Sequence, residues 1–274
     1  MISVLILTKN EEKVINACLA SAHQLAGAEI IVVDNFSEDK TLEIIKKYTK
    51  KIFQKEFEGY AKVRNFSLRQ AQGNWVFYLD ADERISTQLK DEILKETGDK
   101  SQGISAFAVP RKNILLGKWQ KHGGWWPDYQ IRLFKREALK GWSGELHETP
   151  AFSGKLGYLK NPLIHLTHRD IASMMEKTAK WAPIEAKLRA EARHPKMSGW
   201  RFAKIVKGKL FSQFLKGGWR NGTEGWIEIF YQTFSFFITY VKLWEIQRSE
   251  SLESTYSKID KELLKSDFDD KIKV

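Results

Sequence analysis

Two aspartates after an apolar run are the residues of this sequence best placed to do chemistry. The run Trp75-Val-Phe-Tyr-Leu ends at Asp80, and Asp82 and Glu83 follow two and three residues later. Such a run is typical of a buried parallel strand, which delivers Asp80 and Asp82 onto the loop at its end. Carboxylates at this spacing can hold Mg²⁺ or Mn²⁺, and the ion can neutralise a diphosphate leaving group. We therefore expect a divalent metal ion held by Asp82 and Asp80.

The first hundred residues alternate apolar runs with segments of helical spacing. Strands are predicted over residues 3–7, 29–33, 52–54 and 75–79, and helices over 11–25, 37–48 and 60–71. This order predicts an α/β fold with a doubly wound sheet. Ligands bind beyond the carboxyl ends of the strands in such sheets. Asn10, Asp34 and Asp80 all follow predicted strands.

Other polar residues near these strand ends suit a nucleotide. Thr8, Asn10 and Glu11 follow the first strand and are expected to contact a ribose or base. Asp34 can accept hydrogen bonds from the same groups, or it can instead be a turn residue that caps the next helix. Arg64 is expected to reach a diphosphate, with an ordinary surface-helix arginine as the alternative. Neither a GxGxxG nor a GxxxxGK[ST] motif is present, which argues against dinucleotide and P-loop sites.

Four blocks of the first ninety residues resemble family 2 inverting glycosyltransferases of the GT-A fold. The blocks are residues 6–11, 31–41, 61–65 and 78–83. Residues 126–134, 145–148 and 242–245 are similar to the bacterial branch that includes lipopolysaccharide core β-glucosyltransferases. The resemblance implies that Asp34 contacts the base, Asp80 the ribose or metal, and Asp82 the metal and diphosphate. Ala81 lies between them and is assigned to the same nucleotide-sugar site.

The catalytic base is less clearly marked. Many family members carry a Glu-Asp pair for this role, and no such pair occurs in the expected region. Direct displacement with inversion requires a base within hydrogen-bonding reach of the acceptor hydroxyl. The candidates are Glu148, Asp128 and Glu145, and Glu148 is favoured because it belongs to a compact turn over residues 144–148. Asp128 is second, because Arg132 is a basic partner that would make it structural.

Aromatic residues and histidines downstream are assigned to the acceptor and the metal. Trp125, Trp126, Arg132 and His147 are expected to contact the acceptor, since sugar rings stack on aromatic faces; core packing is the alternative for the tryptophans. His168 is offered as a further metal ligand, against a structural, hydrogen-bonded histidine. A zinc HExxH motif is not expected, because Ala151 stands where the second histidine would be.

The positive charge of the chain is concentrated in its later half. Residues 160–220 contain 14 Lys and Arg against 4 Asp and Glu. Such a segment suits nucleic acid, anionic lipid or a phosphorylated substrate, and the lack of RRM, KH or helix-turn-helix signatures argues against nucleic acid. Residues 203, 206, 210 and 214 form an apolar face with lysines around it, typical of an interfacial amphipathic helix. A helix packed on the catalytic domain, with a solvated basic face, is the alternative.

These observations predict a GT-A domain over residues 1–165 and a helical, basic extension over 166–274. The predicted activity is inverting transfer of a hexose from a nucleotide-diphosphate sugar, expected to be UDP-linked, to a glycan or lipid-linked hydroxyl in lipopolysaccharide or polysaccharide biosynthesis. The alternatives are transfer to polyprenyl phosphate and a non-catalytic nucleotide-sugar or nucleic-acid binding protein. The amino terminus lacks the basic flank of a signal peptide, and Cys18 stands alone. We therefore expect a cytoplasmic protein, peripheral on the inner face of an anionic membrane.

Overall fold

The computed structural model describes residues 1–98, 103–144 and 148–265, and the chain divides into two compact units. The first unit comprises Met1–Arg169 and Arg220–Glu224. The second comprises Asp170–Trp219 and the described residues from Gly225 onward. Arg220–Glu224, which lie between two long helical segments of the second unit, therefore belong to the first unit.

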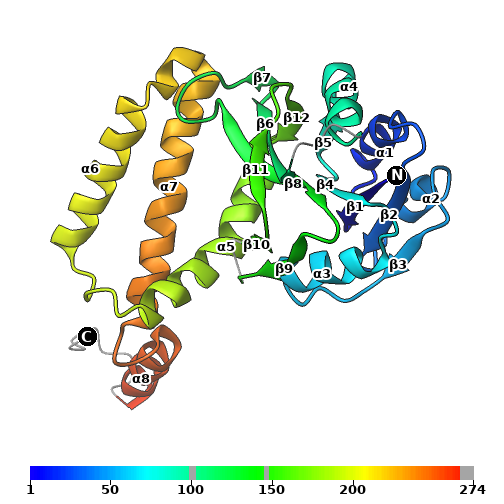
Figure 1. The fold of residues 1–274 in the computed structure, drawn as a ribbon. Helices are drawn as coiled ribbons and strands as arrows, with labels where there is room; N and C mark the ends of the chain where they lie inside the picture. Colours follow the sequence, from blue (N-terminus) through cyan, green and yellow to red (C-terminus); the bar gives the residue numbers. More distant parts are fainter. Residues whose placement is uncertain (99–102, 145–147, 266–274) are drawn as a thin grey trace. The chain divides into compact units, whose positions relative to one another are not determined.

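The first unit is built on one mixed sheet, to which ten strands contribute within the described ranges. Its path is β3-β2-β1-β4-β8-β6-β12-β5, and β7 and β11 pair with β6 (Figure 1). The strands are β1 (Ile2–Thr8), β2 (Glu29–Asp34), β3 (Ile52–Gln54), β4 (Trp75–Asp80), β5 (Glu83–Ile85), β6 (Ile104–Leu115), β7 (Lys118–Trp119), β8 (Asp128–Lys135), β11 (Lys155–Tyr158) and β12 (Leu163–Thr167). A separate antiparallel pair is formed by β9 (Leu139–Ser143) and β10 (Thr149–Phe152).

The parallel strands bring the predicted functional residues to one edge of the sheet. Thr8 of β1 lies in register with Asp34 of β2, and Leu7 lies in register with Asp80 of β4. Beyond β4 the direction changes, because β8 runs antiparallel to both β4 and β6. This insertion carries residues of β8 alongside the strand that ends at Asp80.

Helices cover both faces of the sheet, because β1 and β4 are apolar on both sides. Val4 and Ile6 pack on the side of α1 (Ile15–His23), α2 (Thr41–Ile45) and α4 (Thr87–Glu96), whereas Leu5 packs on the side of α3 (Tyr60–Gln70). Phe77 and Tyr78 are fully buried in these two separate clusters. Each such side chain contributes about 1.5–3 kcal/mol by leaving water. The two-sided core therefore holds β4 firmly behind Asp80.

The predicted α/β class is confirmed, with the parallel strands within about two residues of their predicted ends. The predicted helix over residues 37–48 is wrong in extent, since α2 covers only Thr41–Ile45. The side chain of Ser37 hydrogen-bonds to Asp34 and to the amide of Asn10 and so holds a loop in place of a first helical turn. The predicted helix over 11–25 begins later, at Ile15. There the amide of Glu11 donates to Thr41 across the two loops.

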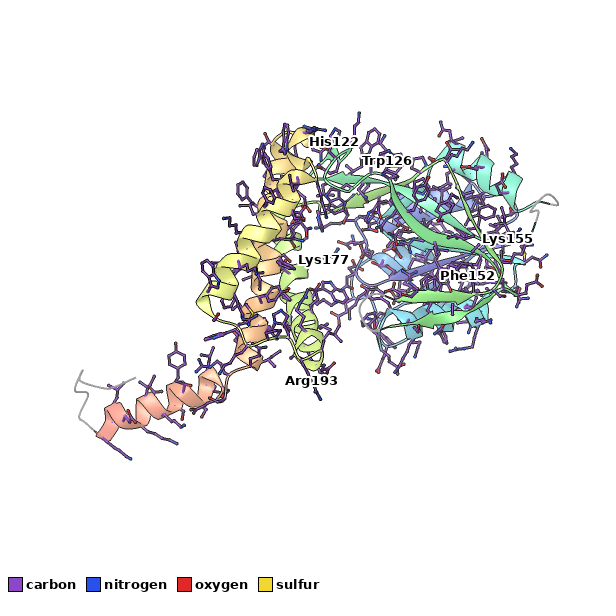
Figure 2. All side chains as sticks on the ribbon, turned by 60° about the vertical axis from the view of Figure 1, so that its left-hand side comes forward. His122, Trp126, Phe152, Lys155, Lys177 and Arg193 are labelled. Carbon is purple, nitrogen blue, oxygen red and sulfur yellow. The ribbon has the colours of Figure 1, made fainter. Side chains whose placement is uncertain are left out.

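The second unit is helical, as the sequence predicted from residue 170 onward. Its helices are α5 (Ile171–Glu191), α6 (Gly199–Leu215), α7 (Thr223–Ile246) and α8 (Leu252–Lys265), with a short 3-10 turn, η1 (Gly218–Asn221), before α7 (Figure 2). Asp170 and Ser198 cap α5 and α6 through their side chains. A small core forms around Ala186, Tyr240 and Leu243. Of the helices in the described part of the chain, none combines the length and apolar character that crossing a membrane requires.

Candidate active site

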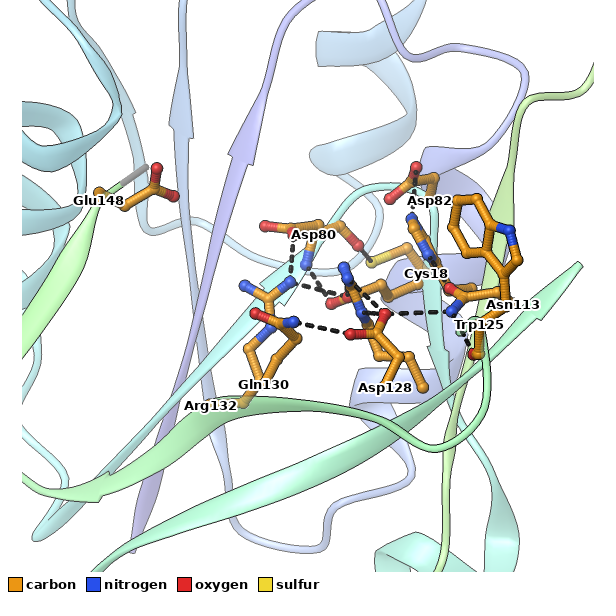
Figure 3. Close-up of polar contacts among 12 residues, drawn as sticks. Cys18, Asp80, Asp82, Asn113, Trp125, Asp128, Gln130, Arg132 and Glu148 are labelled. Carbon is orange, nitrogen blue, oxygen red and sulfur yellow. Dashed lines mark hydrogen bonds and ion pairs between the residues drawn. The ribbon is translucent and has the colours of Figure 1, made fainter. Parts of the chain in front are cut away.

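The carboxylate of Asp80 lies between two arginines from different elements. Arg64 of α3 places Nη2 3.1 Å from Asp80 Oδ1, and Arg132 of β8 donates to Asp80 Oδ2 (Figure 3). Burial alone would raise the pKa of Asp80, but the charges of Arg132 and Arg64 outweigh it and hold this pKa well below its ordinary value. Asp80 is therefore ionised, and both of its oxygens are engaged by cations of the protein.

A buried glutamate completes this arginine cluster. Glu83 is fully buried, and Arg132 Nη2 lies 2.8 Å from its Oε1. The amide of Asp80 donates to Glu83 Oε2 at 3.0 Å, and Arg111 Nη1 lies 3.6 Å from Glu83 Oε1. Burial lowers the pKa of Arg132, yet Asp80 and Glu83 more than compensate and raise it above its ordinary value. The loop after β4 is thus held by a buried network of charge pairs.

Arg64 also holds the favoured candidate base. Its Nε lies 3.0 Å from Oε1 of Glu148, just before β10. Its guanidinium packs against the rings of Trp142 and Tyr78, at 5.0 and 5.3 Å from their centroids. Arg64 is only 5% exposed, so the alternative of an ordinary surface-helix arginine is wrong. Asp80 and Glu148 are thereby joined through one buried cation, although 68 residues separate them in the sequence.

These groups open onto a cavity of about 320 Å³. Charged and aromatic residues of its lining include Arg64, Asp80, Arg132, Trp142 and Glu148. Figure 3 shows Glu148 on one side of Asp80, with Asp82 and Trp125 on the other. The candidate base Glu148 and the strand-end carboxylate of Asp80 therefore belong to one site. Glu145 and His147, the other predicted residues of this turn, lie outside the described residues.

Asp82 has a different environment from Asp80. Its side chain is 36% exposed, and its Oδ2 lies 3.2 Å from Nε2 of His165. His165 is held in turn by Asn113, whose Oδ1 lies 2.6 Å from Nδ1. His165, on β12, is thus the histidine in contact with Asp82. His168 packs its ring edge-on against Trp125, with centroids 6.1 Å apart, and its assignment as a metal ligand stays a prediction.

The surroundings of Asp82 fit a divalent cation better than those of Asp80 do. Burial, followed by the negative charges of Asp82 and Asp39, raises the pKa of Glu11 to about 7. Asp82 and Glu11 therefore repel each other, an effect on Glu11 that Arg169 and Arg84 only partly offset, whereas Asp80 is bound directly by two arginines. Within the part of the chain that the structure describes, no three His, Cys, Asp or Glu side chains group as a metal cage. Asp82 thus fits an ion that takes further oxygen ligands from a diphosphate and water.

The predicted nucleotide-contacting residues lie on two loops that are joined by hydrogen bonds. Asp34 is fully buried and accepts hydrogen bonds from the amide and hydroxyl of Ser37, at 2.9 and 2.5 Å. The amide of Asn10 donates to Ser37 Oγ, and Asn10 Oδ1 accepts from the amide of Glu38. Asn10 takes a left-handed backbone conformation, with φ 54°, to make this turn. The roles of Thr8, Asn10, Glu11 and Asp34 toward a nucleotide stay predictions.

Ala81 links the two aspartates and is 6% exposed. Its carbonyl accepts a hydrogen bond from Arg84 Nη1 at 2.8 Å, which fixes the turn between Asp80 and Asp82. Its assignment to the nucleotide-sugar site also stays a prediction.

The predicted pairing of Asp128 with Arg132 is wrong. Arg132 turns toward Asp80 and Glu83, and Asp128 instead binds Arg111, whose Nη2 lies 2.6 Å from Oδ2. Asn113 and Gln130 also donate to Asp128. Burial raises the pKa of Asp128, but Arg111 and these hydrogen bonds lower it below its ordinary value. Asp128 therefore serves the structure of β8 and β6 and is a poor candidate for the base.

Aromatic residues lie beside the Asp82 side of the site. The carbonyl of Trp125 accepts a hydrogen bond from Asn113, the same residue that holds His165. Trp126, labelled in Figure 2, packs edge-on against Trp119 with centroids 5.7 Å apart. The ring of Trp119 lies under the ammonium groups of Lys112 and Lys121, at 4.4 and 4.6 Å from its centroid. Trp119 of β7 and Lys112 of β6 thus form a cluster of indole rings and cations with Lys121 and Trp126.

Residues 3–154 match the family described as glycosyl transferase family 2. This match covers more than half of the chain. The chain belongs to glycosyl transferase family 2.

Relatives of this glycosyltransferase include a lipopolysaccharide core biosynthesis enzyme and a poly(ribitol-phosphate) transferase. It is 27% identical over 261 residues to the lipopolysaccharide core biosynthesis glycosyltransferase LpsC of Rhizobium meliloti, covering 89% of this chain and 92% of that protein. It is 37% identical over 127 residues to the poly(ribitol-phosphate) β-N-acetylglucosaminyltransferase TarS of Staphylococcus aureus, covering 40% of this chain and 22% of TarS.

Solved structures with some similarity to this glycosyltransferase include the crystal structure of S. aureus TarS 1–349. That likeness has a TM-score of 0.47 and 18% identity over 89% of this chain and 90% of that one. The mannosyltransferase PcManGT of Pyrobaculum calidifontis, in complex with GDP-Man and Mn²⁺, has a TM-score of 0.48 and 14% identity. This likeness covers 96% of this chain and 79% of that one. The predicted GT-A class is confirmed by the mixed sheet, its covering helices and the family match together.

Several residues of the glycosyltransferase site were not identified from the sequence. Glu83, Arg111 and Asn113 connect the two aspartates to β6 and β8, and Lys112 and Lys121 surround Trp119. Glu83 stands directly after the Asp-x-Asp pair, which was the one available signal. The others lie on strands whose pairing partners are distant in the sequence, so no local pattern marks them.

Proposed function

We propose that this glycosyltransferase moves a hexose, with inversion, from a UDP-linked sugar to a hydroxyl of a lipopolysaccharide core or related cell-envelope glycan. The choice of acceptor class is supported by the similarity to LpsC along 89% of the chain. The observation that carries the proposal is the single buried cation of Arg64, which joins the strand-end Asp80 to Glu148 in one cavity.

The donor half of the site lies at the carboxyl ends of β1, β2 and β4. Asp82 would hold a divalent ion, which when bound supplies positive charge to the departing diphosphate. The exposure of its carboxylate and the nearby Glu11 support this assignment. The loops of Asn10 and Asp34 would bind the nucleoside, since both end in polar groups at the same sheet edge.

The acceptor half uses Glu148 as the base. Its carboxylate would accept the proton of the acceptor hydroxyl while that oxygen bonds to the anomeric carbon. The bond from this carbon to the diphosphate oxygen breaks at the same time, and the diphosphate leaves with the electron pair. Attack opposite the leaving group inverts the configuration at the carbon. Arg64 orients Glu148 through a charge-assisted hydrogen bond at 3.0 Å.

An anionic glycan fits the tryptophan cluster on β7 and the segment before β8. The indole rings of Trp119 and Trp126 offer apolar faces on which sugars stack. Lys112 and Lys121 bring two ammonium groups that can bind phosphate or carboxylate groups on such a sugar. The indole N–H of Trp119 is buried and has no hydrogen-bond partner among the residues described. Because this N–H is covered by the protein, the indole faces, and not the N–H, would meet the acceptor.

The test is release of nucleoside diphosphate from UDP-, GDP- and ADP-hexoses, with deacylated lipopolysaccharide core or polyprenyl phosphate as acceptor and Mn²⁺ compared with EDTA. Asp82→Asn and Glu148→Gln are compared with Glu137→Gln, a matched change at an exposed glutamate outside the site. We expect metal-dependent turnover of a UDP-hexose, with Glu148→Gln lowering kcat about 10²–10⁴-fold and Glu137→Gln leaving it unchanged. Equal turnover by Glu148→Gln and wild type would contradict Glu148 as the base. Turnover only with polyprenyl phosphate would overturn the acceptor assignment.

A further inference from the structure

The second unit exposes an unusual number of large apolar side chains on α6 and α7. None of the 17 residues of α6, all within the described range, is buried. Phe202 and Ile205 of α6 rest against the core of the unit, and Phe202 packs on Phe237 of α7. The helix is therefore attached along one side, and its other side faces outward.

The outward face of α6 combines aromatic and basic residues. Trp200, Phe211 and Leu215 are 80%, 61% and 68% exposed. Lys204 and Lys207 are also exposed, and steps of three or four residues place them on the same helical face. Exposed apolar residues scattered singly are ordinary, but a continuous row of this kind marks an interaction surface.

The row continues from α6 onto α7 through direct ring contacts. Phe214 lies 6.0 Å from Trp219 and 6.2 Å from Trp226, between ring centroids, and Trp226 stacks on Phe230 at 6.1 Å. All four rings are at least 39% exposed. We call Phe211, Phe214, Leu215, Trp219, Trp226 and Phe230 the aromatic patch. It is a single surface formed by two helices of one unit.

The charge along α6 and the segments next to it has one sign. Residues 192–223 contain no Asp or Glu. The same stretch contains eight Lys and Arg, namely Arg193, Lys196, Arg201, Lys204, Lys207, Lys209, Lys216 and Arg220. Lysines around an apolar helical face are attracted by anionic lipid headgroups while the rings enter the interface. Trp is favoured at that depth because its ring is apolar with one polar group.

We propose that the aromatic patch and the exposed lysines of α6 bind the surface of an anionic lipid bilayer, with α6 lying in the interface. A helix of this length lies about 25 Å along the surface. The described helices lack the character of a span, so the contact is peripheral. The inference goes beyond the transfer reaction and does not depend on it.

Other occupants fit the surface less well. A symmetric dimer through this face would set the same lysines against each other, since a two-fold interface pairs a patch with itself. A nucleic acid would satisfy the lysines, but protein–nucleic acid interfaces are polar and would leave Phe211, Leu215 and Phe230 in water. The bilayer interface accommodates both the charge and the apolar rings.

The experiment is sedimentation of the full chain with vesicles of equal parts phosphatidylglycerol and phosphatidylcholine, compared with phosphatidylcholine alone. The variants are Phe214→Ser/Phe230→Ser and Lys204→Glu/Lys207→Glu. Their matched controls are Tyr256→Ser, which changes an exposed aromatic residue of α8, and Lys47→Glu/Lys50→Glu, which makes the same charge change in the first unit. Thermal melts verify that each variant is folded.

We expect wild type and both controls to bind the anionic vesicles and to leave them in high salt. Each patch variant should bind at least about ten-fold more weakly, because two anchoring rings or two cations are lost. Wild-type affinity in either patch variant, or no vesicle binding by wild type, would overturn the proposal. So would binding to RNA with no binding to vesicles, or a wild-type dimer that Phe214→Ser/Phe230→Ser dissociates while vesicle binding is unchanged. Sedimentation needs no sugar donor, so its failure is distinct from failure of the proposed function.

Discussion

Asp80 and Asp82 lie two residues apart on one loop, yet their surroundings are opposite. Asp80 faces Arg64 and Arg132, and its carboxylate is neutralised within the protein. Asp82 contacts His165, is more than a third exposed, and shares its surroundings with other carboxylates. The difference assigns separate tasks to the two residues. Asp80 organises the loop and is connected to Glu148 through Arg64, whereas Asp82, which we propose as the metal ligand, remains partly exposed.

The largest effect expected from this contrast is on stability, on the Asp80 side. Arg132→Met leaves Asp80 and the fully buried Glu83 without their shared cation. Removing one partner of a buried charge pair typically costs about 3–5 kcal/mol in the free energy of unfolding. Urea denaturation of Arg132→Met measures this loss. The matched variant Arg136→Met, at an exposed arginine just after β8, should lose less than about 1 kcal/mol. Equal stability of the two variants would contradict the buried network.

A smaller, pH-dependent effect is expected on the Asp82 side. The pKa of Glu11 is raised from 4.5 to about 7 in the folded protein, first by burial and then by Asp82 and Asp39. A raised folded pKa gives stability that is complete below the unfolded pKa and is lost as pH rises through the folded value. Glu11 should therefore lower the free energy of unfolding between pH 4.5 and 7 by no more than about 3 kcal/mol, and by less where solvent screens it.

Glu11→Gln should remove this decline. Denaturation of wild type and variant is compared in EDTA from pH 4.5 to 8, with Glu137→Gln as the control. The prediction is a flatter pH profile for Glu11→Gln alone. An identical slope in wild type and Glu11→Gln would contradict the raised pKa of Glu11.

The smallest effect is expected at the tryptophan cluster. Lys112→Ala should raise KM for a phosphorylated or carboxylated acceptor about ten-fold, because one charge-assisted contact is lost. Its effect on KM for the sugar donor should be under about two-fold, because Trp119 is proposed for the acceptor alone. Initial rates with each substrate varied in turn measure the two constants. A rise in donor KM with unchanged acceptor KM would move this cluster to the donor half.

The sequence predicts the strand-end residues better than their long-range partners, and the reason is physical. Strand ends such as Thr8, Asp34 and Asp80 follow local apolar runs, so their common edge can be derived from the order of elements. The charge pairs of Arg64 with Glu148 and of Arg132 with Asp80 join residues 84 and 52 positions apart. Those contacts depend on β8 inserting antiparallel beside β4, which no local pattern specifies.

Long-range contacts also explain the two local errors. Ser37 and Asp39 have the composition of a helix start, but they bond across to the loop of Asn10 and Glu12 instead. Asp128 lies near Arg132 in sequence, yet four residues of extended strand separate them by about 13 Å, and Arg111 of β6 lies in register with Asp128. In the second unit, the helical pattern was sufficient to predict α5 to α8 from residue 170 onward.

The most direct test of the account is the affinity for UDP with Mn²⁺ and with EDTA, measured by calorimetry on wild type, Asp82→Asn and Glu137→Gln. We predict that Mn²⁺ tightens UDP binding at least about ten-fold, or about 1.4 kcal/mol, in wild type and Glu137→Gln. In Asp82→Asn, Mn²⁺ should have no effect on UDP binding. Equal Mn²⁺ dependence in all three proteins would contradict Asp82 as the residue that holds the metal and diphosphate.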